Sequence, residues 1–414
     1  MQTHLAPEFK DSREGRAAEA ILRKCVHCGF CTATCPTYQL LGDELDGPRG
    51  RIYLIKQMLE GAEVTRSTQQ HLDRCLTCRN CESTCPSGVD YGQLVEIGRQ
   101  LVDERVKRPV AEQAQRWLLK EGLTSPLFGP AVKAGQALRG LLPAALQNKL
   151  PVNGNPDSGA WPTRTHARKV LMLAGCVQPT LAPNINAATA RVLDAAGIQV
   201  LLAPKAGCCG AVRSHLGDPQ GGLDDMRRNI DAWWPQVECG EVEAIVMNAS
   251  ACGLAVKEYG HALAHDPAYA ERAQRISALA RDLSELLPDL VAALQSQLAG
   301  AKLPRVAFHP PCTLQHGQKL RGGIESQLRT LGFEVEIAGE ESHLCCGSAG
   351  TYSVLQPELA YPLRDRKLGH LGKLDAEVIA SANMGCIQHL QSGTETPVRH
   401  WVELLDAALQ TRGR

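Results

Sequence analysis

Cysteines at fixed spacing are the residues of this chain best suited to chemistry. Two packets of four occur fifty residues apart: Cys25, Cys28, Cys31 and Cys35 in CVHCGFCTATCP, and Cys75, Cys78, Cys81 and Cys85 in CLTCRNCESTCP. Each follows C-x2-C-x2-C-x3-C-P, an iron–sulfur spacing found in two-cluster ferredoxins. Zinc sites usually take C-x2-C pairs separated by a longer loop. The packets therefore predict two [4Fe–4S] clusters.

The fourth cysteine of each packet is expected to serve the cluster of the other packet. Three cysteines at two-residue steps can wrap one loop around three iron corners of a cubane, whereas the fourth precedes a proline and leaves that loop. In two-cluster ferredoxins of this spacing it ligates the second cluster. The predicted ligand sets are Cys25, Cys28, Cys31 and Cys85 for cluster 1, and Cys35, Cys75, Cys78 and Cys81 for cluster 2. His27 is not expected to be a ligand.

The elements that position these packets are predicted to be helices. Ile52, Leu54, Ile55, Met58 and Leu59 repeat at helical spacing after the Gly47–Pro48 break, and a second helical run covers about residues 91–106. An α-helical ferredoxin-like domain is thus predicted over residues 1–150. It resembles the helical ferredoxin domains of respiratory iron–sulfur subunits.

The remainder of the chain is predicted to be a duplicated α/β unit. Residues 151–167, rich in Pro, Gly and Asn, are interpreted as a linker. Residues 168–300 and 301–414 then repeat one order of strand, helix, strand and strand, with cysteines that match at offsets of 136, 137 and 134 residues. Such alternation predicts mostly parallel sheets.

Each predicted unit carries a Cys-Cys-Gly motif and two further cysteines beyond the ends of strands. The groups are Cys176, Cys208, Cys209 and Cys252, and Cys312, Cys345, Cys346 and Cys386. The carboxyl edge of a parallel sheet is where ligands gather. Three interpretations stay open: a third metal or cluster in either group, a dithiol redox pair, or a structural turn in which Gly210 and Gly347 supply positive φ. Cys239 stands outside both groups and is predicted to be a buried core thiol.

Composition restricts the classes of function. Forty-four Lys and Arg balance 44 Asp and Glu, so no net field attracts nucleic acid. The N-terminus lacks the apolar segment of a secretory signal, and no apolar run reaches the roughly 20 residues of a membrane-spanning helix. A cytoplasmic protein is expected. Residues 131–150 pair apolar residues with spaced cations, which leaves open a peripheral contact with the cytoplasmic face of the inner membrane.

Paired ferredoxin packets followed by two Cys-Cys-Gly units resemble the cysteine-rich iron–sulfur subunit family, which includes subunits of glycolate oxidase, anaerobic glycerol-3-phosphate dehydrogenase, lactate utilisation and heterodisulfide reductase. GPRGRIYLIK, HPPCTLQHGQK and ESHLCCGSAGTYSVLQPELA are most similar to glycolate oxidase iron–sulfur subunits. The resemblance implies an electron-transfer subunit without catalytic residues of its own. It also implies an FAD-containing partner subunit that oxidises glycolate to glyoxylate, a second FAD-type subunit, and quinone or the respiratory chain as acceptor.

Two alternatives to the glycolate complex stay open. One is electron transfer for a D-lactate or glycerol-3-phosphate dehydrogenase, and the other is a heterodisulfide-reductase-like thiol/disulfide enzyme. Units of the latter type end in C-x2-C, whereas Ala249 and Asn383 stand three residues before Cys252 and Cys386 here. A five-thiol cluster is therefore not expected. The chain has no G-x-G-x-x-G turn for a nucleotide, so FAD is expected on the partner only.

Overall fold

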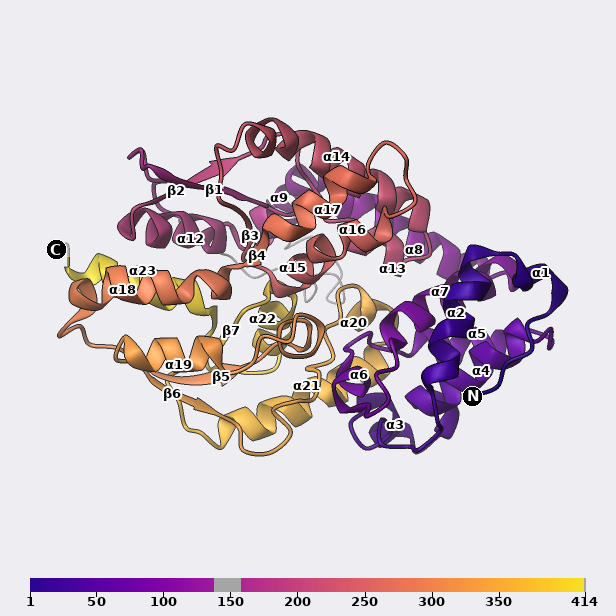
Figure 1. Cartoon of the computed structure of the whole chain (residues 1–414). Coiled ribbons are helices and arrows are strands. Elements are labelled where there is room, and N and C mark those ends of the chain that lie inside the picture. Colours follow the sequence, from indigo (N-terminus) through magenta and orange to yellow (C-terminus); the bar gives the residue numbers. More distant parts are fainter. Residues whose placement is uncertain (138–157, 413–414) are drawn as a thin grey trace. The chain divides into compact units, whose positions relative to one another are not determined.

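The computed structural model describes residues 1–137 and 158–412 (Figure 1). Packing divides the chain into two compact units that do not follow chain order. Unit 1 contains Met1–Gln115, Pro310–Leu320 and Gly339–His370, and unit 2 contains Arg116–His309, Arg321–Ala338 and Leu371–Arg414. Two loops of the second Cys-Cys-Gly repeat thus pack within the same unit as the ferredoxin packets.

Unit 1 is helical. Its N-terminal part contains α1 (Pro7–Lys10), α2 (Arg13–Lys24), α3 (Pro36–Leu41), η1 (Glu44–Asp46), α4 (Pro48–Leu59), α5 (Arg66–Asp73), α6 (Asn80–Thr84) and α7 (Tyr91–Arg105). The two helices predicted from periodicity are confirmed as α4 and α7. Helix α3 starts at Pro36, directly after Cys35, because proline suits the first turn of a helix, where its missing N–H has no partner to lose. The later segments add η4 (Thr313–Gly317), α20 (Tyr352–Leu355) and most of α21 (Pro357–Gly372).

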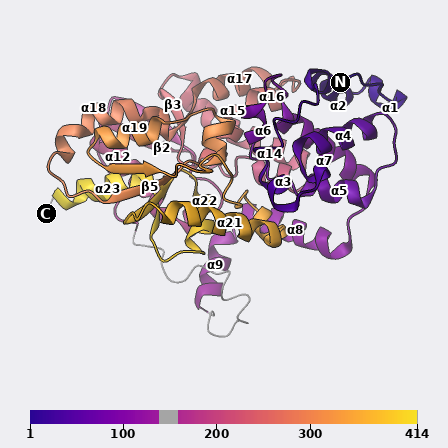
Figure 2. The same ribbon diagram turned by 90° about the horizontal axis from the view of Figure 1, so that it is seen from below.

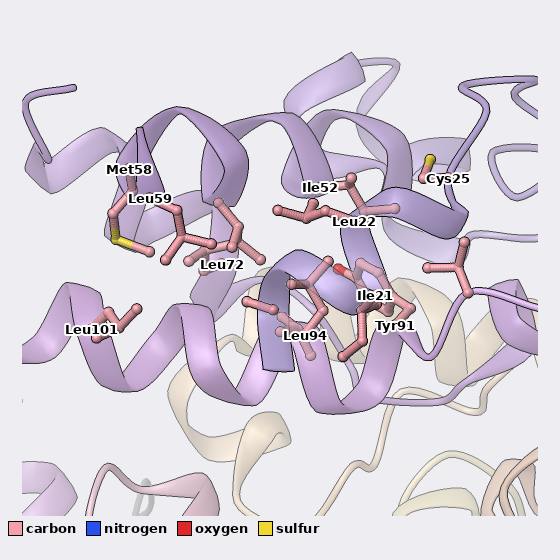
Figure 3. Packing of buried hydrophobic residues seen from close by; sticks show 14 of the residues in the cluster. Ile21, Leu22, Cys25, Ile52, Met58, Leu59, Leu72, Tyr91, Leu94 and Leu101 are labelled. Carbon is pink, nitrogen blue, oxygen red and sulfur yellow. The ribbon is translucent and has the colours of Figure 1, made fainter. Parts of the chain in front are cut away.

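The core of unit 1 forms where α2, α4, α5 and α7 meet. Leu22, Ile55, Leu59, Leu72 and Leu94 are fully buried there. Figure 3 shows Cys25 and Tyr91 at one end of this cluster, on the same side as Ile52. The cysteine loops are therefore anchored directly to the core. This gives the thiols fixed positions.

Unit 2 contains two four-stranded sheets in which every pairing is parallel. The first has the order β2-β1-β3-β4 and the second β6-β5-β7-β8. The strands are β1 (Arg168–Met172), β2 (Ile198–Leu202), β3 (Ala244–Met247), β4 (Ala280–Asp282), β5 (Arg305–His309), β6 (Glu334–Ile337), β7 (Val378–Ser381) and β8 (Val398–His400). The predicted duplication and parallel sheets are confirmed, and all six predicted strands are present. The edge strands β4 and β8 were not predicted.

Helices cover the sheets of unit 2. Helices α12 (Pro183–Ala195), α18 (Leu287–Leu298), α19 (Gly323–Thr330) and α23 (Trp401–Arg412) pack against one another between the two sheets (Figure 1). The remaining helices are α11 (Gln178–Leu181), α13 (Ala211–His215), α14 (Pro219–Glu238), α15 (Ser250–Lys257), α16 (Tyr259–Ala262), α17 (Ala270–Leu279), η3 (Leu283–Leu286) and α22 (Met384–Gln391). The first sheet packs on Trp233 of α14, which is completely buried.

The segments between the packets and the sheets are only partly described. Helix α8 (Val110–Thr124) joins the two units, and α9 (Phe128–Ala137) runs to the last residue before the gap (Figure 2). Residues 158–167 carry no helix or strand. Most of the segment considered for membrane contact, residues 138–150, lies outside the described residues, as do residues 151–157 of the expected linker.

Candidate iron–sulfur sites

Five thiols from both packets line one cavity, which we call site 1. Cys25, Cys28 and Cys31 come from the loop between α2 and α3, Cys81 from α6, and Cys85 follows α6. The cavity opens to solvent and, with its mouth included, has a volume of about 440 Å³. Cys25 is buried, whereas Cys28 is exposed. The structure thus places Cys85 of the second packet with the first three cysteines of the first.

The mirror arrangement defines site 2. Cys75, Cys78 and Cys81 of the second packet line a second cavity together with Cys35 of the first. This cavity also opens to solvent and, with its mouth included, has a volume of about 300 Å³. Tyr91 and Cys81 line both cavities, so the two sites are neighbours. Each site contains the set of thiols predicted to bind one cluster.

The two loops adopt the same backbone conformation. His27 and Gly29 have φ values of 57° and 86°, and Thr77 and Arg79, at the matching positions of the second packet, have 51° and 56°. Left-handed backbone is uncommon for residues other than glycine and marks sites where the surroundings enforce it. In both loops the two residues that flank the middle cysteine take this conformation. The duplicated geometry follows from the duplicated spacing.

Polar groups beside site 1 fit a bound cluster. The Nε2 atom of His27 is buried without a hydrogen-bond partner at the wall of the cavity. A buried polar atom without a partner costs free energy, so it suits a site where a bound group would accept its hydrogen bond. Burial, together with Cys25 and Cys28, raises the pKa of Cys31 to about 11. When a metal binds, it displaces the protons of such closely packed thiols, because the ligand in iron–sulfur ligation is the thiolate.

Compared with site 1, site 2 has more hydrogen-bond donors to its sulfur atoms and more positive charge around it. The amide of Thr77 donates to Cys75 Sγ at 3.4 Å, and the hydroxyl of Tyr91 donates to the same sulfur at 3.6 Å. Burial alone would raise the pKa of Cys75, but Arg51 and Arg99, with these two donors, hold it below its usual value. The thiolate form needed for ligation is therefore favoured at this position.

Arg51 is the centre of a buried network at site 2. It is 1% exposed and lines the cavity. Its Nε donates to His71 O at 2.7 Å, and its Nη atoms donate to Thr37 Oγ1 at 3.2 Å. Asp46 lies 3.5 Å away and also pairs with His71 and Arg74. Sequence analysis did not single out Arg51 or Asp46, because charged residues near Gly and Pro resemble an exposed turn.

Part of the second Cys-Cys-Gly group packs on site 2. Cys345 belongs to a small core with Leu76, Tyr352 and Leu363, and Cys78 and Cys312 lie against it. The Sγ atoms of Cys312 and Cys345 are 3.8 Å apart. Hydrogen bonds hold these segments together: Tyr352 Oη to Arg74 O, Asn80 Nδ2 to His343 O, and Ser83 Oγ with His316 Nδ1. Sequence analysis did not predict this contact, because it joins residues more than 200 positions apart.

The fourth cysteine of this group belongs to the other unit. Cys386 lies on α22 in unit 2, where Asn383 Nδ2 contacts its Sγ at 3.5 Å. Lys367 is buried beside Cys345 and Cys346, and its ammonium donates to Glu341 O. Burial lowers the pKa of Lys367, and the neighbouring thiols oppose that shift.

The first Cys-Cys-Gly group lies entirely within unit 2. Its thiols form a chain of side-chain contacts from Cys176 to Cys208, Cys209 and Cys252. Contacts from Cys176 and Cys209 lower the pKa of Cys208, while the pKa values of Cys176 and Cys209 are raised. The structure therefore brings together the four cysteines that the sequence grouped.

Gly210 and Gly347 both have the predicted positive φ, at 93° and 90°. In each case a Cβ atom would also collide with a backbone carbonyl, that of Gly222 at 2.7 Å or that of Ala360 at 2.4 Å. The prediction for Cys239 is wrong. This thiol is exposed, because it caps the C-terminus of α14 and its Sγ contacts Gln236 O at 3.6 Å.

These sites define an iron–sulfur protein that transfers electrons, and comparison with known proteins supports that class. Residues 21–89 match the 4Fe-4S dicluster domain, and residues 170–257 and 306–391 each match the cysteine-rich domain. The glycolate oxidase iron-sulfur subunit of Escherichia coli (strain K12) is 54% identical over 99% of this chain and 100% of that protein. The probable glycolate oxidase iron-sulfur subunit of Bacillus subtilis (strain 168) is 31% identical over 94% of this chain and 91% of that protein.

The chain belongs to the family of glycolate oxidase iron–sulfur subunits. More distant similarity links it to the lactate utilization protein A of Geobacillus thermodenitrificans (strain NG80-2), which is 27% identical over 58% of this chain and 98% of that protein. Among the helices of the described residues, none has both the length and the apolar character needed to cross a membrane.

Proposed function

We propose that the chain is the electron-transfer subunit of a glycolate dehydrogenase, or oxidase, complex, and that sites 1 and 2 each hold one [4Fe–4S] cluster. The observation that carries this proposal is the pairing of three cysteines from one packet with the fourth cysteine of the other in each of two adjacent cavities. Clusters bound there would supply carriers for single electrons. The match to glycolate oxidase subunits over nearly the whole chain supports the choice of complex.

The reaction divides between this chain and its partners. Oxidation of glycolate to glyoxylate releases two electrons and two protons, which an FAD on a partner subunit accepts. This chain receives the electrons singly and passes them on. A quinone that takes up two electrons and two protons completes the balance, and a second FAD-type subunit belongs to the same proposed complex. We propose a location in the cytoplasm, with the complex peripheral on the inner membrane.

The proposed function assigns a role to each segment of the chain. We propose an electron-transfer domain over residues 1–150, a linker over 151–167, and Cys-Cys-Gly units over 168–300 and 301–414. The ranges matched by the dicluster and cysteine-rich domains each fall within one of these segments.

The first experiment isolates the tagged chain anaerobically with the subunits that co-purify, and follows its visible iron–sulfur absorption. Addition of glycolate is expected to bleach that absorption, because the FAD subunit passes the electrons to sites 1 and 2. D-lactate and glycerol 3-phosphate serve as comparison substrates. Bleaching by one of these and not by glycolate would assign the chain to a different dehydrogenase complex.

We also propose a further metal in the first Cys-Cys-Gly group. Its four thiols are in one unit and form a chain of side-chain contacts, and one of them has a lowered pKa, as a metal ligand should. Cys208→Ser is expected to remove one metal ion or cluster, measured by elemental analysis of iron and zinc, while sites 1 and 2 keep theirs. Cys239→Ser, at an exposed thiol outside the groups, is the control. If wild type and Cys208→Ser had equal metal content, this group would bind no metal and its Cys-Cys-Gly motif would serve as a structural turn.

A further inference from the structure

The two proposed cluster sites differ in the charge that surrounds them. Of the described residues, two arginines line site 2, Arg51 and Arg79, whereas Arg49 is the one arginine that lines site 1. Arg49 is neutralised by Glu44 at 2.6 Å and is about one-third exposed, so solvent screens it. Arg51 is 1% exposed. A buried guanidinium keeps its charge and acts through a low dielectric.

The negative charge near Arg51 does not cancel the positive charge at site 2. Asp46 is the carboxylate beside Arg51, at 3.5 Å, but it also pairs with Arg74 at 2.8 Å and with His71 at 3.0 Å. Arg99 adds a further cation near Cys75, with its Nη2 donating to Cys75 O at 2.6 Å. Glu82 is a second negative charge, which acts on Cys81. Arg51, Arg74 and Arg99 still outnumber Asp46 and Glu82, so the surroundings of site 2 retain an excess of positive charge.

Hydrogen-bond donors to the ligand sulfurs follow the same asymmetry. At site 2, Cys75 accepts from the hydroxyl of Tyr91 and from the Thr77 amide. At site 1 the comparable group is His27 Nε2. Reduction adds one negative charge, and both cations and donors to sulfur stabilise that charge.

We propose that site 2 is the electron-collecting end of the pair, with a higher reduction potential than site 1, and that Arg51 is the positioning residue that sets this difference. Electrons then arrive at site 1, where Cys28 is exposed, and move to site 2, where Cys78 lies against Cys312 and Cys345. This inference rests on the proposed pair of clusters. It specifies the direction of transfer between them.

The test is an anaerobic redox titration of the purified full chain, with mediators and dithionite, followed by electron paramagnetic resonance. Two signals are expected. Cys28→Ser, at the exposed ligand, should alter the spectrum of the lower-potential signal and so assign it to site 1. Arg51→Met should lower the potential of the other signal, so that its reduced-to-oxidised ratio at a fixed potential falls about tenfold, which is about 59 mV for one electron.

Conservative variants separate electrostatics from folding. Arg51→Lys keeps the charge and should restore most of the potential. Tyr91→Phe removes a single hydroxyl and should lower the same signal by less, which tests the idea even if Arg51→Met fails to fold. Arg49→Met, at the screened arginine, should leave the site 2 signal unchanged. An unchanged site 2 potential in both Arg51→Met and Tyr91→Phe, or assignment of the higher potential to site 1, would overturn the inference.

The titration uses neither glycolate nor a partner subunit, so its result is independent of the substrate. A wild-type chain with one signal would contradict the two-cluster assignment itself. Two signals in the reverse order would leave the proposed function intact and refute only the direction of transfer.

Discussion

At the scale of single residues, the crossing of ligands between packets is the feature that can be tested most directly. Cys85 lines the cavity of the first packet, and Cys35 lines that of the second. Cys85→Ser should therefore impair the cluster bound by Cys25, Cys28 and Cys31. Cys35→Ser should impair the other one. Each variant is expected to lose up to about half of the packet-bound iron and labile sulfide.

Spectroscopy decides whether the crossing is real. Electron paramagnetic resonance of Cys85→Ser should show the same signal altered as in Cys28→Ser, even though these cysteines belong to different packets. If Cys85→Ser instead altered the same signal as Cys75→Ser, each packet would bind its own cluster and the crossed assignment would be wrong.

The sequence predicted the cysteines better than their surroundings. The likeness of the spacing to two-cluster ferredoxins predicted that Cys85 would join the first packet and Cys35 the second, and these thiols line those cavities. The buried charges Arg51 and Asp46 were not predicted, since their burial depends on His71 and Thr37, which come from other elements. Local pattern carries no information about such long-range pairing.

At the scale of elements, the Cys-Cys-Gly turn depends on its glycine. Gly347 has φ 90°, and an added Cβ would lie 2.4 Å from Ala360 O. Gly347→Ala should therefore lower the free energy of unfolding by more than the roughly 1–2 kcal/mol of left-handed backbone alone. Gly350→Ala is the matched control, because Gly350 has φ 65° but nothing within 4 Å of the Cβ position. Equal thermal midpoints for the two variants would show that the close contact has no effect.

His400, the last residue of the edge strand β8, is expected to make unit 2 sensitive to acid. Burial lowers the pKa of His400 to about 3, and its Nδ1 accepts from Val402 N at 3.2 Å. In the unfolded chain a histidine titrates near pH 6.5. The unfolded state therefore binds this proton first, and stability falls as the pH drops from about 6.5 towards 3.

From pH 6.5 to pH 5 the contribution of His400 amounts to about 2 kcal/mol. His400→Gln should flatten this part of the stability profile, measured as denaturant midpoints at several pH values. His265→Gln, at an exposed position, should keep the wild-type slope. The same slope in both variants would mean that other groups cause the acid sensitivity.

Sequence analysis missed two strands, and the physical reason is the same for both. Strands β4 and β8 are three residues long and read ARD and VRH, with a charged residue at the centre or end. Edge strands bury only one side and need no long apolar run. The six predicted strands are four or five residues long, and those inside the sheets carry apolar runs such as KVLM and AIVM. Hydrophobic pattern therefore finds the interior of a parallel sheet more readily than its edge.

At the scale of the whole molecule, electrons must reach the chain from another protein, and the surface around Cys28 is the place that suits this. Val26 and Phe30 flank Cys28 in the loop and are 67% and 63% exposed. Tyr53, at 45%, packs edge-on to His27. Exposed apolar side chains beside an exposed ligand are typical of a surface that contacts a partner. The proposed FAD subunit is the partner that the glycolate reaction requires.

Phe30→Glu should therefore slow reduction of the chain by the glycolate-oxidising subunit about tenfold or more, because a charge is placed in the apolar contact. Stopped-flow absorption of the reconstituted complex measures this rate, and reduction by dithionite should stay normal, since the thiols themselves are unchanged. Leu41→Glu introduces the same charge at another exposed apolar residue, one that does not line site 1. If both variants slowed the transfer equally, added negative charge would be the cause, and the partner would have to dock elsewhere.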